Sequence, residues 1–267
     1  MCLLILAHRV SSDYPLLVAA NRDEFHARPT AASQFWPEHP ELLAGRDLLQ
    51  GGTWMGMTRS GRFAAVTNYR DPAQPPEPAR SRGDLSLQYL TGSQTPKDFL
   101  HDIAARAGDY AGFNLLVGDR TSLWHYTNSD TKGPQNLPPG VYGLSNATLD
   151  TPWPKVMLGK AKLLALLETG AISHRTLSGV VSSQSLADRS SLSAQGLHST
   201  MESTLSPQFI ITDTYGTRSS TTLWFDAHAQ ANWLELSFNA QGVLCEEQHQ
   251  EISLNDQQYN AGSNGAQ

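Results

Sequence analysis

The chain opens with MCLLILAH (residues 1–8), and after a turn it continues with LLVAANRDEF (residues 16–25). Both stretches begin as apolar runs of strand length, and the Ser, Asp and Pro residues between them mark a turn. They therefore predict a β-hairpin whose second strand runs into the polar block Asn-Arg-Asp-Glu. Cys2 stands at the head of the first strand, directly behind the initiating methionine. The only other cysteine is Cys245, so Cys2 is either incidental or a functional residue.

The composition is that of an ordinary globular protein. Of the 267 residues, 39% are hydrophobic and 16% are charged, and the net charge of −6 argues against a dedicated nucleic-acid binder. Two cysteines cannot build a disulfide framework, which favours a reducing compartment. The apolar run from Cys2 to Ala7 is too short to span a membrane, and no basic segment precedes it. We therefore expect a cytoplasmic protein without membrane insertion, and the sequence does not indicate its oligomeric state.

Strand-like segments flank a central helical region. Residues 31–41 are expected to form a loop, and the proline-rich residues 71–84, which include Arg82, an exposed loop. The expected helices are residues 85–90, 96–107 and 155–168. The expected later strands are residues 112–117, 122–127, 141–145, 208–212, 220–225, 233–239 and 243–248. This order indicates one α+β domain over residues 1–254, and the composition of residues 255–267 predicts a disordered tail.

A cysteine at position 2 has a distinctive chemistry. Removal of the initiating methionine would leave Cys2 with both a thiol and a free α-amine. Their reference pKa values are about 8.5 and about 7.7–8.0, so both groups change protonation near neutral pH. A nucleophile needs a base that accepts its proton. In such a residue the nucleophile and its base belong to the same amino acid.

The rest of such a site can be listed from its chemistry. The thiolate needs a nearby cation, the ammonium needs acceptors, and a tetrahedral oxyanion needs preset donors. If the hairpin forms, its second strand returns Arg22 and Asp23 to the neighbourhood of Cys2. Asn68 and Asn146, each at the end of an expected strand, are candidate oxyanion donors. Each feature also has an ordinary interpretation: an incidental cysteine, a surface ion pair and two turn asparagines.

The motifs together resemble those of one known family. They are NRDE (21–24), AGRDL (44–48), GGTWMG (51–56), TNYR (67–70), GFNLLVGD (112–119), GLSNATLDTPWPK (143–155) and YGTRSST (215–221). The set resembles the NRDE family, also called the transport and Golgi organisation protein 2 family. That family is similar to N-terminal nucleophile cysteine hydrolases of the choloylglycine hydrolase and penicillin V acylase type.

The resemblance implies a four-layer αββα sandwich with Cys2 at the end of a central strand. It also implies roles for five further residues. Arg22 and Asp23 would contact the nucleophile, Asn68 and Asn146 would bind the oxyanion, and a late arginine, Arg218, would support the thiolate. In the hydrolases the pair that corresponds to Arg22 and Asp23 is separated, whereas here the two residues are adjacent.

Two functions from different classes follow. The first is a cysteine amidohydrolase that acts on a non-peptide C–N bond of a small molecule. The second is a non-catalytic carrier of haem or lipid on the same fold, in which Cys2 or a histidine could ligate haem iron. The nine histidines show no metal-ligand spacing, so no metal and no resident cofactor is expected. Trp36 and Trp54 are candidates for a substrate-pocket wall.

Overall fold

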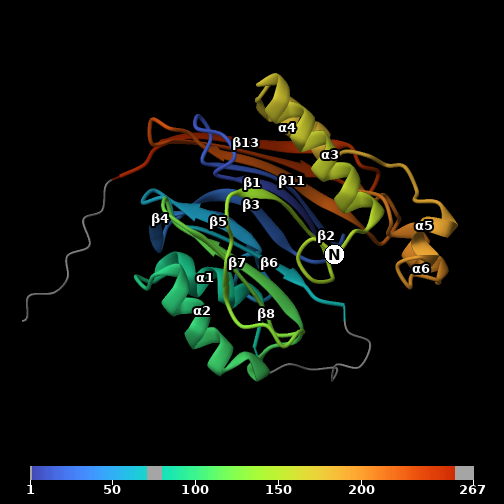
Figure 1. The fold of residues 1–267 in the computed structure, drawn as a ribbon, viewed down its shortest axis with the longest axis horizontal. Helices are drawn as coiled ribbons and strands as arrows, with labels where there is room; N and C mark the ends of the chain where they lie inside the picture. Colours follow the sequence, from blue (N-terminus) through green and yellow to red (C-terminus); the bar gives the residue numbers. More distant parts are fainter. Residues whose placement is uncertain (1, 71–79, 256–267) are drawn as a thin grey trace, which may run out of the picture.

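The computed structural model describes residues 2–70 and 80–255 and contains two antiparallel β-sheets that pack face to face (Figure 1). Sheet A has the order β10 (Gly140–Leu144), β1 (Cys2–His8), β2 (Leu16–Phe25), β11 (Tyr215–Phe225), β12 (Gln230–Phe238), β13 (Leu244–Ser253). Sheet B has the order β3 (Thr30–Trp36), β4 (His39–Asp47), β5 (Met55–Thr58), β6 (Phe63–Asn68), β7 (Phe113–Gly118), β8 (Leu123–Thr127), β9 (Gln135–Asn136).

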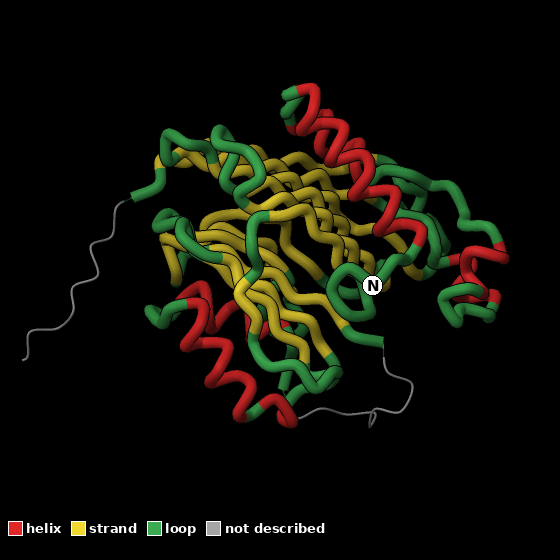
Figure 2. The backbone as a smooth tube through the Cα atoms, viewed as in Figure 1, coloured by secondary structure: helices red, strands yellow, loops and turns green. Residues whose placement is uncertain are grey.

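Helices cover the outer faces of both sheets (Figure 2). The helices α3 (Pro154–Thr169) and α4 (His174–Val180) pack on sheet A, and α1 (Gly83–Thr91) and α2 (Pro96–Ala105) pack on sheet B. Two short helices, α5 (Arg189–Ser193) and α6 (Thr200–Thr204), lie to one side of this sandwich. The predicted four-layer αββα arrangement is therefore confirmed.

The first strand is apolar throughout because both of its faces are buried. Successive side chains of a strand point to opposite faces. Leu4 and Leu6 enter the core between the sheets, while Leu3 and Ile5 pack against the layer of α3 and α4. Each such buried side chain contributes roughly 1.5–3 kcal/mol of hydrophobic stabilisation. The packing holds Cys2, at the start of this strand, in a fixed position.

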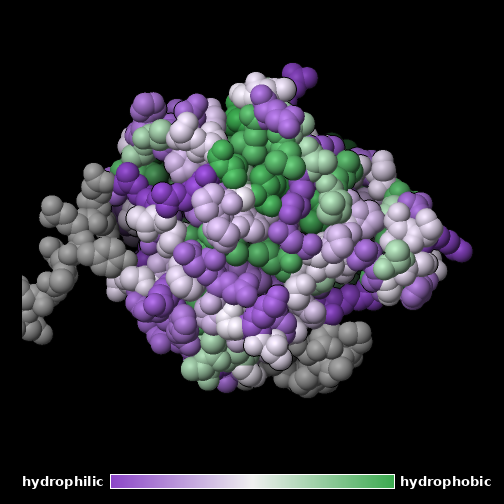
Figure 3. Space-filling model, in the orientation of Figure 1, coloured by the Kyte–Doolittle hydropathy of each residue, from purple (hydrophilic) through white to green (hydrophobic). Residues whose placement is uncertain are grey.

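One helix carries apolar side chains on its exposed side as well. On α3, Met157, Leu158 and Leu164 are each at least 40% exposed. Apolar side chains gather on the surface in this region (Figure 3). No helix within the two described ranges combines the length and the apolarity that a membrane span requires.

Two of the sequence predictions are wrong in local detail. Residues 31–41 belong largely to β3 and β4, whose register is broken by irregularities that obscure the alternation expected of paired strands. Residues 208–212 form no strand, because Gln208 and Phe209 bond to other segments. The Gln208 carbonyl accepts from Asn21 Nδ2 at 2.8 Å, and the Phe209 N–H donates to the Ser183 carbonyl at 2.9 Å.

The predicted hairpin and the three predicted helices are confirmed, with shifted ends. Helix α4 was not predicted, although Ser173 caps it with a reciprocal capping box to Thr176. Residues 71–79 of the predicted loop and residues 256–267 of the predicted tail lie outside the described residues.

Candidate active site

Cys2 lies directly opposite Arg22 in the pairing of β1 with β2. Side chains of residues that face each other across a ladder point to the same side of the sheet. Because Leu4 on β1 faces sheet B, Cys2 and Arg22 also face sheet B. Their neighbour in the next strand is Ser219, which pairs with Arg22. The hairpin thus delivers a cation to the thiol, as the sequence predicted.

A small cavity adjoins these two residues. Its lining includes Trp54 from the segment before β5, Val66 from β6 and Thr221 from β11. The space open to the centre of a water-sized sphere is about 10 Å³, which is room for about one water molecule. Among the described residues, the thiol thus lies on the lining of a cavity of solvent size.

Arg22 is buried and held by two contacts. Its guanidinium carbon lies 4.2 Å from the centroid of the Trp54 ring, and Nη1 donates to Thr30 Oγ1 at 3.1 Å. Trp54 fits there because Gly45 has no side chain, since a Cβ at Gly45 would lie 2.3 Å from Cη2 of Trp54. Burial lowers the pKa of Arg22, and the charge of Cys2 opposes that shift. An arginine stays protonated in proteins, so this cation is permanent.

The thiol of Cys2 experiences opposing influences. Burial raises its pKa most strongly, while the charges of the chain's amino terminus and of Arg22 lower it. The negative charge of Asp23 raises it. The residue itself keeps some exposed surface. The nearby cations thus partly offset the cost of forming a thiolate in a buried position.

Asp23 follows Arg22 and faces the opposite side of sheet A. It is buried, and its Oδ1 accepts a hydrogen bond from Thr217 Oγ1 at 2.7 Å. Burial raises the pKa of this carboxyl, and the chain's amino terminus and Lys155 oppose the shift. Because Arg22 and Asp23 are adjacent on β2, their side chains point to opposite faces of sheet A.

Lys155 is a charged residue near Cys2 that was not predicted from sequence. It lies in the first turn of α3 and is 5% exposed. Its Nζ donates to the Leu205 carbonyl at 3.3 Å, and burial lowers its pKa against the charges of Asp23 and Cys2. The residue ends the motif GLSNATLDTPWPK, and this is the one signal that could have identified it.

The two predicted asparagines lie together beside the start of β1. Asn146 is buried, and its Nδ2 donates to the Asn68 carbonyl at 2.8 Å. The neighbouring Ser145 donates from Oγ to the Cys2 carbonyl at 2.9 Å, and its own carbonyl accepts from Thr67 Oγ1 at 2.7 Å. The side chain of Asn68 is exposed at the end of β6. These bonds tie the ends of β6 and β10 to the start of β1.

Arg82 is a second cation near the thiol, although the sequence suggested a solvated loop residue. Burial lowers its pKa, and the charge of Cys2 is the first to oppose this. Its Nη1 donates to the Gly112 carbonyl at 3.2 Å, which also accepts from the Tyr69 N–H beside the end of β6. Backbone packing fixes the segment, since a Cβ at Gly52 would lie 2.5 Å from the carbonyl carbon of Gly83.

Glu235 on β12 is a buried carboxyl close to the cavity, and it too was not predicted. Its Oε1 accepts from the Ser33 N–H at 2.7 Å, and its Oε2 lies 3.4 Å from Thr221 Oγ1, a donor from the cavity wall. Burial raises the pKa of Glu235 to about 7, although the hydrogen bond from Ser33 and the charge of Arg22 act in the opposite direction.

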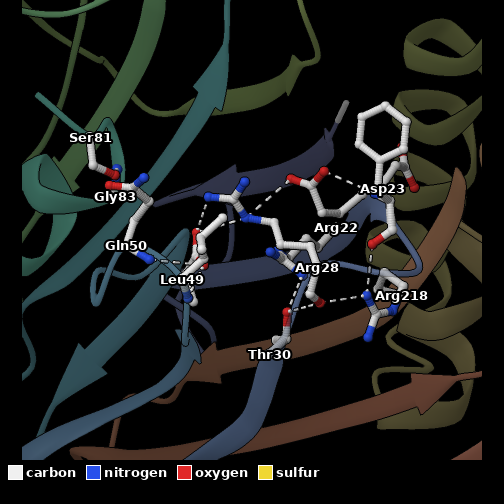
Figure 4. Close-up of polar contacts among 12 residues, drawn as sticks. Arg22, Asp23, Arg28, Thr30, Leu49, Gln50, Ser81, Gly83 and Arg218 are labelled. Atoms are coloured by element: carbon white, nitrogen blue, oxygen red, sulfur yellow. Dashed lines mark hydrogen bonds and ion pairs between the residues drawn. The ribbon is translucent and has the colours of Figure 1, made fainter. Parts of the chain in front are cut away.

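Two predicted site residues do not line the cavity. Arg218 donates from Nη1 to the carbonyls of Phe25, His26 and Arg28 at 2.9, 3.2 and 3.1 Å, so it holds the turn after β2 (Figure 4). It sits at a bulge where the β2–β11 register shifts, which redirects its side chain. Trp36 is buried between sheet B and its helices, and its Nε1 donates to the Ala44 carbonyl at 2.9 Å. Of the two predicted pocket tryptophans, only Trp54 lines the cavity.

Within the described ranges, no group of three or more His, Cys, Asp or Glu side chains is arranged to hold a metal ion. The cluster around Cys2 instead combines a thiol, two arginines, a lysine, two carboxyls and amide donors. Such a set suits nucleophilic attack by sulfur and stabilisation of negative charge.

Residues 1–240 match the profile of the family described as Transport and Golgi organisation 2. The chain belongs to this family. A Bos taurus member, Transport and Golgi organization protein 2 homolog, is 35% identical over 240 residues, which cover 84% of this chain and 87% of the relative. The Homo sapiens homolog is 40% identical over 163 residues, which cover 58% of this chain and 59% of the relative.

Two solved structures align with this family member. A Caenorhabditis elegans N-acylethanolamine-hydrolyzing acid amidase ortholog aligns with a TM-score of 0.50 and 10% identity, covering 83% of this chain and 92% of that one. A variant of the conjugated bile acid hydrolase from Clostridium perfringens aligns with a TM-score of 0.46 and 9% identity, covering 97% and 94%. At such low identity the amidase likeness bears on the fold alone, and it agrees with the predicted N-terminal nucleophile hydrolase architecture.

Proposed function

We propose that this protein is an N-terminal nucleophile cysteine amidohydrolase that cleaves a non-peptide amide bond of a small molecule. Removal of Met1 would free the α-amine of Cys2. The observation that carries the proposal is the register of the first hairpin, which sets Cys2 directly opposite the buried cation Arg22. The placement of Asp23, Arg82 and Asn146 around the same strand end supports it.

The first half of the reaction would form a thioester. The α-amine of Cys2 takes the proton from Sγ, and the thiolate attacks the carbonyl carbon of the amide. The C=O bond becomes a C–O⁻ bond, and amide groups of Asn146 and Asn68 would donate to this oxyanion. When the oxyanion collapses, the C–N bond breaks and the ammonium returns its proton to the leaving amine. An acyl group then remains on Sγ.

The second half would use water. The free α-amine takes a proton from water as its oxygen attacks the thioester, and collapse of the second oxyanion breaks the C–S bond. The products are a carboxylic acid and the restored Cys2. Arg22 and Arg82 would hold the thiolate in both halves, and Asp23 would orient the ammonium. A reducing cytoplasm would keep the thiol available.

Acyl transfer to Cys2 tests the proposal directly. The mature protein would be incubated with a series of acyl p-nitroanilides, and intact and peptide mass spectrometry would follow the chain. We expect Met1 to be absent, an acyl adduct on Cys2, and release of p-nitroaniline that disappears in Cys2→Ala but persists in Cys245→Ala. Retained Met1 would contradict the proposal, as would turnover unaffected by Cys2→Ala.

A haem titration separates the carrier alternative from the hydrolase. Absorbance spectra would be recorded with the wild-type chain and with Cys2→Ala. Saturable one-to-one haem binding that depends on Cys2, without hydrolysis of any amide in the series, would favour the carrier. Turnover without specific haem binding would favour the hydrolase.

A further inference from the structure

The face of sheet A that meets sheet B carries a buried carboxyl that the proposed reaction does not use. Glu235 on β12 lies opposite Thr221 on β11 and is 1% exposed. Asp23 is the other carboxyl in the described part of the chain with less than a tenth of its surface exposed, and it faces away from sheet B. Glu235 is therefore the buried carboxyl on the side of sheet A where the Cys2 thiol lies.

Its hydrogen bonds link the two sheets. The Ser33 N–H on β3 donates to Glu235 Oε1 at 2.7 Å, and Trp233, two residues earlier on the same face, donates from Nε1 to Ser33 Oγ at 2.9 Å. A glutamine could accept from the Ser33 N–H equally well, since its amide oxygen is also an acceptor. Hydrogen bonding to Ser33 alone therefore does not explain why this residue is an acid.

The position of Glu235 behind the wall of the cavity that Arg22 lines offers a reason. Arg22 is buried, and an uncompensated buried charge is costly. Among the packed elements, β3 offers Glu235 only the uncharged Ser33, and β13 places Gln248 opposite it. The charges acting on Arg22 itself are those of Cys2, Glu24, Asp47 and Arg218. Glu235 is not among these, but the charge of Arg22 acts on Glu235 in favour of the ionised carboxylate. The geometry agrees, since Thr221 contacts Glu235 and lines the same cavity as Arg22 and Cys2.

We propose that Glu235 is a positioning residue of the Cys2 site, which sets how much of the Arg22 charge is available to the thiolate. An ionised Glu235 shares the cation with Cys2 and so disfavours the thiolate. A protonated Glu235 leaves the cation to Cys2 alone and favours the thiolate. Thr221, which contacts Glu235 and lines the cavity, places the carboxyl behind the cavity wall.

Glu235 would change between its neutral and ionised forms close to neutral pH. Because burial raises the pKa of Glu235 to about 7, the carboxyl is mostly neutral at pH 5.5 and mostly ionised at pH 8. As the pH falls, the thiol of Cys2 would then keep more of its reactivity than a cysteine whose neighbouring arginine stays paired with an ionised carboxylate. The inference rests on the proposed function, since a reactive thiolate has no evident use without it.

The pH dependence of thiol alkylation tests the inference without any substrate. Iodoacetamide rates would be measured from pH 5.5 to 9 in a Cys245→Ala background, with and without Glu235→Gln. We expect equal rates at pH 5.5, where both side chains are neutral, and at pH 8 a rate about threefold or more higher in Glu235→Gln. A ratio that does not change with pH would overturn the inference.

Two further variants separate charge from packing. Trp233→Phe removes the other hydrogen bond to Ser33 without changing any charge, and Glu247→Gln removes an exposed carboxylate from the adjacent strand β13. Both should leave the pH profile of alkylation unchanged. A profile altered equally by Trp233→Phe would show that Glu235 acts only as a structural link, against the proposal.

The two proposals fail in different ways. If no amide is cleaved but Glu235→Gln changes the pH profile of alkylation, the hydrolase proposal fails and the link between Glu235 and Cys2 stands. If amides are cleaved and the alkylation ratio does not change with pH, the hydrolase proposal stands and the role of Glu235 fails.

Discussion

At the scale of single residues, the site depends on charges that are buried close to one thiol. Arg22, Arg82 and Lys155 are cations whose pKa values are each lowered by burial. Burying a charge costs several kcal/mol unless other groups compensate it. Arg22 and Lys155 are buried and Arg82 is half-buried, and such a group of cations around Cys2 agrees with the proposed stabilisation of negative charge there.

The contribution of Arg22 to the thiolate can be measured by substitution. Arg22→Gln removes the cation that lies against Trp54, so the pKa of the Cys2 thiol should rise and alkylation at pH 7 should slow about tenfold. Arg46→Gln is a matched control, because the Arg46 guanidinium carbon lies 4.3 Å from the centroid of the Trp36 ring, away from the cavity. Equal rates in Arg22→Gln and wild type would remove Arg22 from the site.

Lys155 should affect the pKa of the Cys2 α-amine rather than the position of the Cys2 sulfur. Its positive charge near Asp23 disfavours a second cation at the start of the chain, so Lys155→Met should raise the pKa of the Cys2 α-amine. Acylation of that amine at pH 7 should slow roughly three- to tenfold, as followed by peptide mass spectrometry. Lys160→Met is the control, since Lys160 pairs with Asp150 at 2.7 Å. A slowing of similar size in Lys160→Met would contradict the assignment.

At the scale of elements, β1 is fixed by close contact with α3. Gly159 on that helix has no side chain where it meets β1, and a Cβ there would lie 2.5 Å from Cγ1 of Ile5. The helix can therefore approach the strand closely. This contact supports the strand only three residues from Cys2.

The same substitution should have opposite effects in two helices. Gly159→Ala should destabilise the fold by about 1–3 kcal/mol, because Ile5 must move within a packed core. Gly179→Ala on α4 meets nothing within 4 Å, so the gain in helix propensity should stabilise the fold or leave it unchanged, by up to about 1 kcal/mol. Urea unfolding of both variants measures this. A stable Gly159→Ala protein would refute the close packing.

At the scale of the whole molecule, the cavity beside Cys2 lies where the two sheets meet. Sheet A contributes Cys2, Arg22 and Glu235, and sheet B contributes Trp54 through its loops and Asn68 through β6. A change that loosens the contact between the sheets would therefore alter the surroundings of the thiol. The link from β12 to β3 is the clearest such contact.

The free energy of unfolding should depend on pH because Glu235 belongs to that link. The folded-state pKa of Glu235 is about 7 and its ordinary value is 4.5. A raised pKa means that the folded state binds the proton more tightly. The stabilisation is therefore complete below pH 4.5 and is lost as the pH rises through 7. At 1.36 kcal/mol per pKa unit, the loss is about 3 kcal/mol.

Glu235→Gln removes this titration. The difference in the free energy of unfolding between wild type and Glu235→Gln should change by up to about 3 kcal/mol between pH 4.5 and 8, with wild type losing stability. Urea unfolding at both pH values measures it. A difference that stays constant with pH would show that the carboxyl titrates normally.

The sequence by itself determined the hairpin and what the hairpin implies. Two apolar runs of strand length around a turn predict the hairpin, which returns Arg22 and Asp23 to the neighbourhood of Cys2. The register that sets Cys2 directly opposite Arg22 came from the structure, because β1 is buried on both faces and shows no alternation. The motifs likewise predicted the αββα fold. The positions of Asn68 and Asn146 near Cys2 came from the resemblance to a family rather than from spacing.

Only the tertiary structure decided which distant residues complete the site. Lys155, Arg82 and Glu235 come from segments separated along the chain, and no local pattern states which of them meet. A single bulge beside Arg218 turned that side chain to the carbonyls after β2, and burial in the outer core removed Trp36 from the pocket. Apolar runs around a turn indicate which strands pair in a hairpin, whereas contacts between layers depend on long-range registers that a sequence pattern does not encode.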